Sequence, residues 1–402
     1  MDYTALTEQL VKTCRDRGAD AAEVYLQAGR TLSVEVRNGA LETVEEAASQ
    51  GVGVRVFVKG RMAFCSSNDL RPASLEAAAA RAIEFARSTT ADENNVLPAD
   101  KDLAAVEGLY DPAIGTVSMD RKIEMALAVE KLAMKDPRIT KSAGAGYGER
   151  EAEIFLANSN GLSKRYKTSS CSLGVSVVAE KGDQRSSGGE RCSRRYFADL
   201  LAPEAIASRA IAATVELLDP RRVKTQRAAV IFDPDVAGSI LGGILQAVNG
   251  ERVLQGASFL GALLNQRIAS DLVTLVDDGL RAKGLASAPF DGEGVPTQRR
   301  VIVEKGVLRG FMYNTAAARR AGVTSTGNAS RRGFTSLPDI GPHNFSMQAG
   351  TTPPADIVRS TPRGLWLKGV TGYGINVVNG NYSGGAEGLW IENGAVAFPV
   401  KG

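Results

Sequence analysis

Alternation between apolar and polar residues dominates the N-terminal part of the chain. The apolar members recur at every second position in three runs: Ala22, Val24 and Leu26; Leu32, Val34 and Val36; and Val52, Val54, Val56 and Val58. A period of two places such side chains on one face of a strand, as in the half-buried strands of an antiparallel sheet. Asn38-Gly39 lies between two of the runs and predicts a tight hairpin, because both residues tolerate positive φ.

Helix signals flank and follow these strands. They fall at four segments: residues 3–17, 72–88, 119–135 and 203–218. Each of them has helical periodicity, a capping residue or a proline in its first turn. Strand patterns return between residues 138 and 197, with a turn predicted at 158–161. We interpret Gly144, Gly146 and Gly148 as a turn, because a strand pattern follows them where a phosphate loop requires a helix.

The sequence therefore predicts an α+β protein of two domains. Residues 1–220, with a middle segment of about 115–220, should form a twisted, mainly antiparallel sheet covered by helices. Residues 225–402 should form a strand-rich domain that begins with a strand at 228–232 and a helix at 234–248. After this helix the sequence turns to Gly, Asn, Thr and short β-prone runs, which favours irregular strands over a βαβ array.

Composition excludes several classes of partner. The 402 residues include 48 Lys and Arg against 45 Asp and Glu, so a net charge of +3 gives no field for binding nucleic acid. No segment has the length of uncharged residues that crosses a membrane, and the N-terminus does not resemble a signal peptide. The four cysteines form no Cys-x-x-Cys pair, which indicates reduced thiols and a cytoplasmic protein.

His343 is the only histidine, which excludes any site that needs two imidazoles. It could act as a general base or form part of a substrate subsite, or it could be a loop histidine satisfied by backbone partners. No Gly-x-Ser-x-Gly motif occurs, which argues against a serine hydrolase. Asp277-Asp278 and Asp291-Gly292-Glu293 bring carboxylates together, either for acid–base work or a hard cation, or as solvated turns.

Two distant stretches resemble a known family. They are residues 284–297 (GLASAPFDGEGVPT) and 374–394 (GINVVNGNYSGGAEGLWIENG), and both are similar to the C-terminal domain of TldD/PmbA proteins, which are also called modulators of DNA gyrase. Residues 51–56 (GVGVRV) and 171–179 are similar to the same family in order and spacing. The resemblance covers essentially the whole chain.

The resemblance implies a cytosolic complex of two homologous chains that cleaves peptides and matures a peptide antibiotic precursor. A TldD-like chain binds zinc through His-Glu-x-x-x-His on the first helix of its C-terminal domain, whereas a PmbA-like (TldE-like) chain lacks that motif. The corresponding helix here, residues 234–248, contains no His or Cys and one acid, Asp235. The resemblance thus implies a chain without catalytic or metal-binding residues and without a cofactor of its own. Residues 327–332 are also similar to the zinc-bearing chain.

Small and amide residues near the C-terminus are the best candidates for substrate contact. The candidate substrate-binding residues are Asn379, Asn381, Tyr382, Ser383, Gly384 and Gly385, together with Asp291. Glycine lets a peptide backbone approach closely, and Asn and Ser can hydrogen-bond along it. Three functions stay open: a non-catalytic subunit paired with a TldD-like zinc-bearing homologue, a homodimeric peptide-binding protein without peptidase activity, and an independent enzyme that uses carboxylates.

Overall fold

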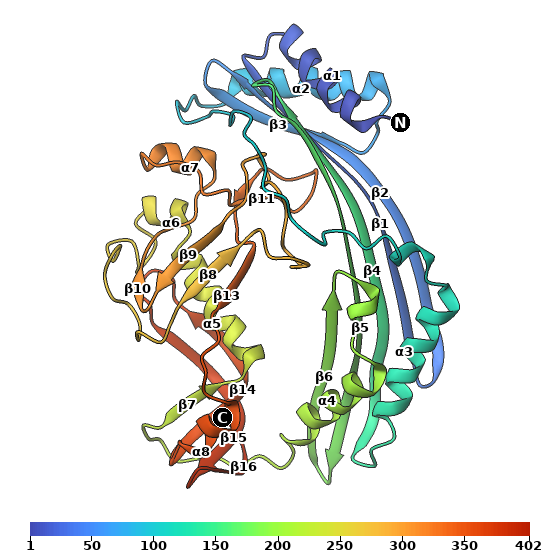
Figure 1. The fold of residues 1–402 in the computed structure, drawn as a ribbon, viewed down its shortest axis with the longest axis vertical. Helices are drawn as coiled ribbons and strands as arrows, with labels where there is room; N and C mark the ends of the chain where they lie inside the picture. Colours follow the sequence, from blue (N-terminus) through green and yellow to red (C-terminus); the bar gives the residue numbers. More distant parts are fainter.

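A long, curved antiparallel sheet forms the N-terminal half of the molecule (Figure 1). The computed structural model describes residues 1–402, except for the side chain at position 373. The strands lie in the order β3-β2-β1-β4-β5-β6. Their bounds are β1 (Ala21–Arg37), β2 (Ala40–Val58), β3 (Arg61–Ser67), β4 (Ile139–Asn158), β5 (Ser163–Lys181) and β6 (Gln184–Arg194). The antiparallel sheet and the Asn38-Gly39 hairpin, with φ of 53° and 76°, are confirmed.

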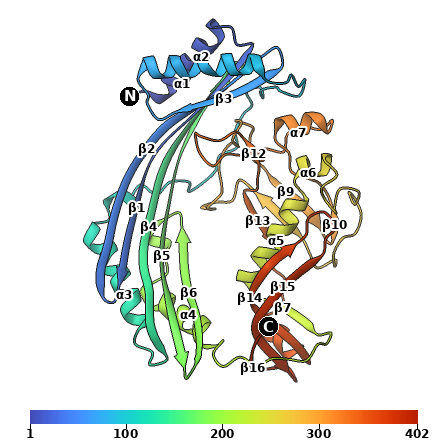
Figure 2. The same ribbon diagram turned by 180° about the vertical axis from the view of Figure 1, so that it is seen from behind.

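One face of this sheet is covered by helices. They are α1 (Tyr3–Asp16), α2 (Pro72–Ser88), α3 (Met119–Ala133) and α4 (Pro203–Val215), with short 3-10 turns η1 (Ile114–Thr116) and η2 (Phe197–Asp199). In β1, Val24 and Leu26 belong to a core under α1 and α2. Val34 and Val36, on the same face, belong to a second core under α3 and α4. The other face, called here the inner face, is turned towards the C-terminal half (Figure 2).

Two predictions in this half are wrong in detail. The first two apolar runs form one strand, β1, instead of two, because a single strand crosses both cores. Gly144, Gly146 and Gly148 lie within β4 and do not form a turn. Glycine is needed at position 146 because a Cβ there would lie 2.7 Å from the carbonyl oxygen of Val34, and at position 144 because its φ is 114°.

The C-terminal half is rich in short strands, as predicted. Its helices are α5 (Pro234–Ala247), α6 (Gly250–Leu254), α7 (Thr315–Arg320) and α8 (Pro354–Arg359). Its strands are β7 (Ala229–Phe232), β8 (Leu275–Asp278), β9 (Arg299–Glu304), β10 (Val307–Leu308), β11 (Ala329–Ser330), β12 (Asp339–Ile340), β13 (Asn344–Met347), β14 (Arg363–Ile375), β15 (Tyr382–Glu392) and β16 (Ala395–Lys401).

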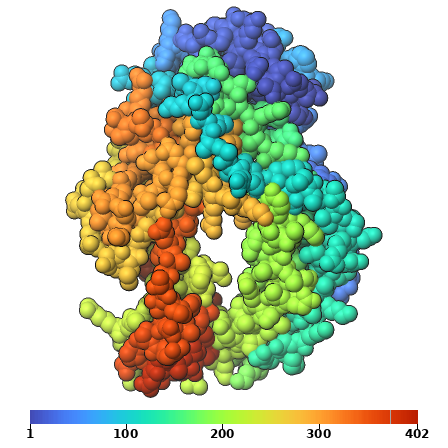
Figure 3. Space-filling model, in the orientation of Figure 1, coloured from blue at the N-terminus to red at the C-terminus, as the bar shows by residue number. Residues whose placement is uncertain are grey.

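These strands form three sheets around a core of their own. The orders are β10-β9-β8-β13, β11-β12 and β16-β15-β14-β7, and β7 pairs parallel with β14. Ala247, Leu260 and Ile302 lie in the core between α5 and the first of these sheets. The two halves contact each other near one end of the curved sheet. Further along the sheet, an opening separates them (Figure 3). Across the described part of the chain, no helix combines the length and apolar character that crossing a membrane requires.

Candidate functional site at the junction of the two halves

The motif Gly51-Val52-Gly53-Val54-Arg55-Val56 builds the contact between the halves. Its valines are buried under the helices, so Gly51, Gly53 and Arg55 lie on the inner face. A Cβ at Gly51 would overlap the ring of Phe334 in the C-terminal half, and one at Gly53 would overlap the backbone of Phe334. The glycines therefore make room for the docking of the C-terminal half.

Arg55 holds the two halves together through buried ion pairs. Its guanidinium donates to Glu23 of β1 at 2.8 Å and to Glu293 of the C-terminal half at 3.0 Å. Arg331 of the C-terminal half pairs in turn with Glu23. All four side chains are at most 8% exposed. Burial opposes the charge of Arg55, but the Glu23 and Glu293 carboxylates outweigh it and raise the pKa of Arg55.

A second arginine, Arg195, connects the sheet to the loop at residues 284–287 of the C-terminal half. Among the described residues, its hydrogen-bond partners include no carboxylate. It donates to the carbonyl oxygens of Gly284, Leu285 and Ser287 at 3.0, 2.8 and 3.0 Å. It also donates to the carbonyl oxygen of Ser169 at 3.1 Å and to the hydroxyl of Thr168. Burial lowers the pKa of Arg195, but the guanidinium stays protonated because its ordinary pKa is so high.

A cavity of about 580 Å³ lies between the halves, and Arg195 and Arg331 form part of its lining. It is called here the junction cavity. The sheet contributes side chains from β1, β4 and β5, and the C-terminal half contributes the loops around residues 285–292, 329–332 and 341–343. Tyr166 and Phe290 meet edge to face in its wall, with ring centroids 5.1 Å apart. The lining residues used below are Arg150, Ser170, Arg195, Asp291, Arg331, Arg332 and His343.

Asp291 is the buried carboxylate of this cavity. Its oxygens accept hydrogen bonds from the backbone N–H groups of Glu293, Val295 and Ala329 at 2.9, 3.0 and 2.9 Å. Burial has the largest effect on the pKa of Asp291, followed by the charge of Glu293, and together they raise it to about 7. The three backbone hydrogen bonds lower this pKa, but by less. Asp291 is 4% exposed and Glu293 1%, so the interpretation of this triplet as a solvated turn is wrong.

His343 lies at the rim with backbone partners. Its Nε2 lies 2.7 Å from the carbonyl oxygen of Gly327, and its Nδ1 lies 3.3 Å from that of Ala286. Its backbone N–H donates to Asp277, whose other oxygen accepts from Asn328 at 2.8 Å. Burial raises the pKa of Asp277, although the charge of His343 opposes the change. These contacts confirm a loop histidine with backbone partners.

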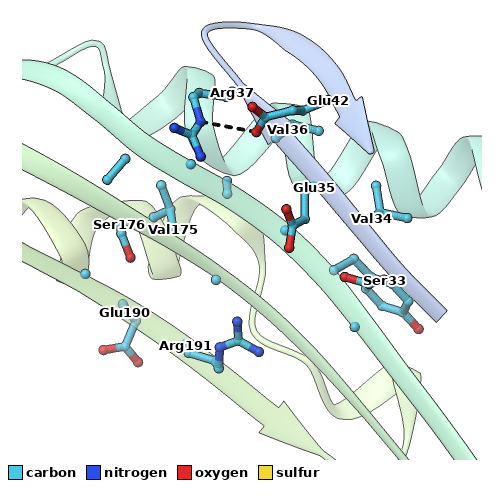
Figure 4. Close-up of a pocket in the computed structure, with 18 residues that line it drawn as sticks. Ser33, Val34, Glu35, Val36, Arg37, Glu42, Val175, Ser176, Glu190 and Arg191 are labelled. Atoms are coloured by element: carbon cyan, nitrogen blue, oxygen red, sulfur yellow. Dashed lines mark ion pairs between the residues drawn. The ribbon is translucent and has the colours of Figure 1, made fainter. Parts of the chain in front are cut away.

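The cavity continues as a groove along the inner face. It shares Arg150, Ser170 and Leu285 with a hollow of about 430 Å³, which in turn shares Gly148 with another of about 470 Å³. Figure 4 shows this last hollow, which Ser33 and Glu35 of β1 border on one side and Ser176 of β5 and Arg191 of β6 border on the other. Small residues line much of the groove, so an extended chain could lie close to the strands.

The structure does not bring all the predicted substrate-binding residues together. Asp291 lines the junction cavity, whereas residues 379–385 form the turn between β14 and β15 and the start of β15. Asn379, Asn381, Tyr382, Ser383 and Gly384 are exposed, and Gly385 is half-buried. Sequence reasoning missed Arg150, Arg195 and Arg332. Arg150 lies in β4 and Arg195 directly follows β6, and the polar sequence around each has no distinctive pattern. For Arg332 a signal was present, because two adjacent arginines, Arg331 and Arg332, indicate a positively charged site.

The residues present do not fit a zinc site of the His-Glu-x-x-x-His type. Helix α5 contains neither His nor Cys, and its one acid, Asp235, lies exposed in the first turn. Zinc in proteins is held by three or four ligands of these kinds. Among the described residues, no group of three or more His, Cys, Asp or Glu side chains is placed to hold a metal ion.

Comparison with known proteins covers nearly the whole chain. Residues 22–86, 112–218 and 225–402 match the PmbA/TldA metallopeptidase domain 1, central domain and C-terminal domain. The metalloprotease PmbA of Escherichia coli O157:H7 is 31% identical over 98% of this chain and 87% of its own length.

Solved structures agree with this assignment. A Bacteroides thetaiotaomicron protein described as a modulator of DNA gyrase has a TM-score of 0.91 and 29% identity, and the match covers 100% of this chain and 90% of that one. TldE from Thermococcus kodakarensis has a TM-score of 0.89 over 98% of this chain and 90% of that one; at 24% identity, this likeness concerns the fold. The chain therefore belongs to the PmbA/TldD family of metallopeptidase-related proteins.

Proposed function

We propose that this chain is the metal-free subunit of a TldD/TldE-type complex that cleaves peptides. The observation that carries the proposal is a long groove on the inner face of a chain whose helix α5 lacks zinc ligands. In this account the chain binds and orients the peptide, and a homologous zinc-bearing partner supplies the bond-breaking chemistry. No catalytic residue is assigned to this chain, because His343, Asp277 and Asp291 are held by structural hydrogen bonds.

Exposed apolar side chains in the C-terminal half support a partner surface. On β7, β16 and α8, four large apolar residues are at least 40% exposed: Val230, Phe232, Ile357 and Val396. Permanent assemblies bury mostly apolar surfaces, on the order of 2,000 Å² or more. Homologous chains generally pair through equivalent surfaces, so we assign this surface to the contact with the zinc-bearing homologue.

Co-purification tests this assignment. A tagged form of this chain should retain an untagged homologue that carries His-Glu-x-x-x-His, and Phe232→Glu should weaken that retention at least tenfold. Leu41→Glu is the matched control, because Leu41 is 46% exposed on β2 of the other half and should have no effect. Absence of association, or equal loss in both variants, would refute the proposal.

The same groove favours a second candidate, a homodimeric peptide-binding protein. The groove is built by this chain alone, so peptide recognition does not depend on a zinc-bearing partner. An equivalent surface on a second copy could cover the apolar residues of β7 and β16. A chain that forms stable dimers by light scattering and does not retain the zinc-bearing homologue would favour this candidate.

A further inference from the structure

The junction cavity has an excess of positive charge. Four arginines line it, Arg150, Arg195, Arg331 and Arg332, and Arg331 pairs with Glu23. The guanidinium of Arg195 donates hydrogen bonds to carbonyl oxygens and to a hydroxyl, and these uncharged acceptors do not neutralise its charge. Among the residues that the structure describes, Arg150 and Arg332 have no carboxylate partner. Against these three charges stands one carboxylate in the lining, Asp291.

Arg150 and Arg332 approach the cavity from its two walls. Arg150 lies on β4, on the inner face, where its backbone pairs with Thr31 of β1 and Ser170 of β5. Arg332 follows β11 in the C-terminal half. Both are exposed at the surface of the cavity, in contrast to the buried Arg55 and Arg331 of the ion-pair network. Their guanidinium groups are therefore available to a ligand that enters between the halves.

We propose that Arg150 and Arg332 bind a carboxylate of a peptide that lies in the junction cavity. Arginine presents parallel N–H donors that match the two oxygens of a carboxylate, and charge-assisted bonds of this kind are the strong ones. The hydroxyl of Ser170, beside Arg150, adds a further donor. Low-dielectric walls on both sides strengthen the attraction, since they focus the field of the arginines.

The carboxylate can be the C-terminus of the peptide or an acidic side chain. The groove continues from Arg150 past Gly148 to the far end of the inner face, so the rest of the peptide can extend along β4 and β5. That the anion belongs to a peptide rests on the proposed function. That the ligand is an anion rests on the arginines alone.

Direct binding to the isolated full-length chain tests the proposal. The probes are N-acetylated pentaalanine as the free acid, its C-terminal amide, and an N-acetylated, amidated pentapeptide with a central glutamate. We expect the free acid or the glutamate peptide to bind at least tenfold more tightly than the neutral amide, measured by calorimetry. Whichever acid binds identifies the source of the carboxylate.

Variants locate the site. Arg150→Gln and Arg332→Gln should each weaken binding of the acidic peptide about tenfold and leave the neutral amide unchanged, and Arg150→Lys should recover part of the loss. Arg81→Gln is the matched control, because Arg81 is an exposed residue of α2 on the helix-covered face. Binding should also weaken as salt is added.

Several outcomes would overturn the proposal. They are equal binding of acidic and neutral peptides, an equal effect of Arg81→Gln, or binding of inorganic phosphate at this site with no binding of any peptide. The assay uses this chain alone, so a failure to associate with the zinc-bearing homologue would count against the proposed function without changing the result here.

Discussion

At the scale of single residues, buried charge fixes how the two halves sit. Glu23 and Arg55 come from the sheet, and Glu293 and Arg331 come from the C-terminal half. Removing one partner of a buried pair leaves the other charge desolvated and uncompensated. Arg55 takes the place of a glycine on the inner face of residues 51–56, which hinted at a special contact there, but a partner 238 positions away cannot be inferred from sequence.

Arg55→Met should therefore lower the free energy of unfolding by about 3–5 kcal/mol. Arg17→Met is the control, since the Arg17–Glu76 pair is exposed (43% and 55%) and such pairs contribute about 0–1 kcal/mol. Urea denaturation of the isolated chain measures both changes. Equal effects of the two substitutions would mean that the buried pairs do not stabilise the junction.

Asp291 should make stability depend on pH. Its pKa in the folded chain is about 7, above the ordinary value of 3.8. The folded state therefore binds the proton more tightly than the unfolded state, and this stabilisation is complete below about pH 4 and is lost as the pH rises through about 7. The raised pKa of Asp277 acts in the same direction.

We thus expect the urea midpoint to fall between about pH 5 and about pH 8. Asp291→Asn should be less stable at the lower pH, because the amide replaces one acceptor oxygen, and its midpoint should change less with pH. A midpoint that rises over this interval, or a slope that is the same in Asp291→Asn, would show that Asp291 does not titrate there.

At the scale of elements, glycines decide where strands can curve and where the halves can meet. The hairpin at Asn38-Gly39 and the helices α2, α3 and α5 could be predicted because their signals are local: turn dipeptides, caps and first-turn prolines. The glycines of β4 could not be assigned, since the crowding at Gly146 comes from β1, more than a hundred positions earlier in the sequence. For the same reason, the position of Arg150 and Arg332 on the walls of one cavity was not predictable.

Gly51→Ala should destabilise the chain by about 1–3 kcal/mol, because the new methyl group would overlap the ring of Phe334. Gly238→Ala is the matched control: Gly238 lies in α5 with no atom within 4 Å of an added Cβ, so alanine should stabilise by about 0.5–1 kcal/mol. Thermal or urea unfolding gives both values. Gly51→Ala should recover when Phe334 is replaced by Ala, and the absence of that recovery would contradict the explanation.

The β14–β15 turn offers a test of substrate contact in the assembled complex. We propose that residues 379–385 contact the peptide there, although several of them are exposed in the single chain. Asn381→Ala should lower peptide cleavage by the complex at least fivefold without changing the stability of this subunit. Leu272→Ala, at another exposed site, is the control. Full activity of Asn381→Ala would remove this turn from the substrate site.

At the scale of the whole molecule, the groove runs along the inner face of the curved sheet. An opening separates part of this sheet from the strand-rich C-terminal half (Figure 3). The α+β class and the strand-rich C-terminal half follow from periodicity and composition. The arrangement of the halves does not, since it depends on contacts such as those of Arg195 with residues 284–287. The groove suits an extended peptide, and the chain lacks the ligands of the zinc helix.

The isolated chain should bind no stoichiometric zinc, because α5 offers one exposed carboxylate and no His or Cys. Elemental analysis after desalting measures this directly. One tightly held zinc ion per chain would contradict the assignment as a metal-free subunit.

Peptide cleavage by separately purified chains tests the central claim most directly. This chain and its homologue with His-Glu-x-x-x-His would be assayed alone and after mixing at equal concentrations, with a peptide that the mixture cleaves. The account predicts cleavage by the mixture at least a hundredfold faster than by either chain alone. Cleavage by this chain alone at the rate of the mixture, or an unchanged rate for the homologue when this chain is added, would contradict it.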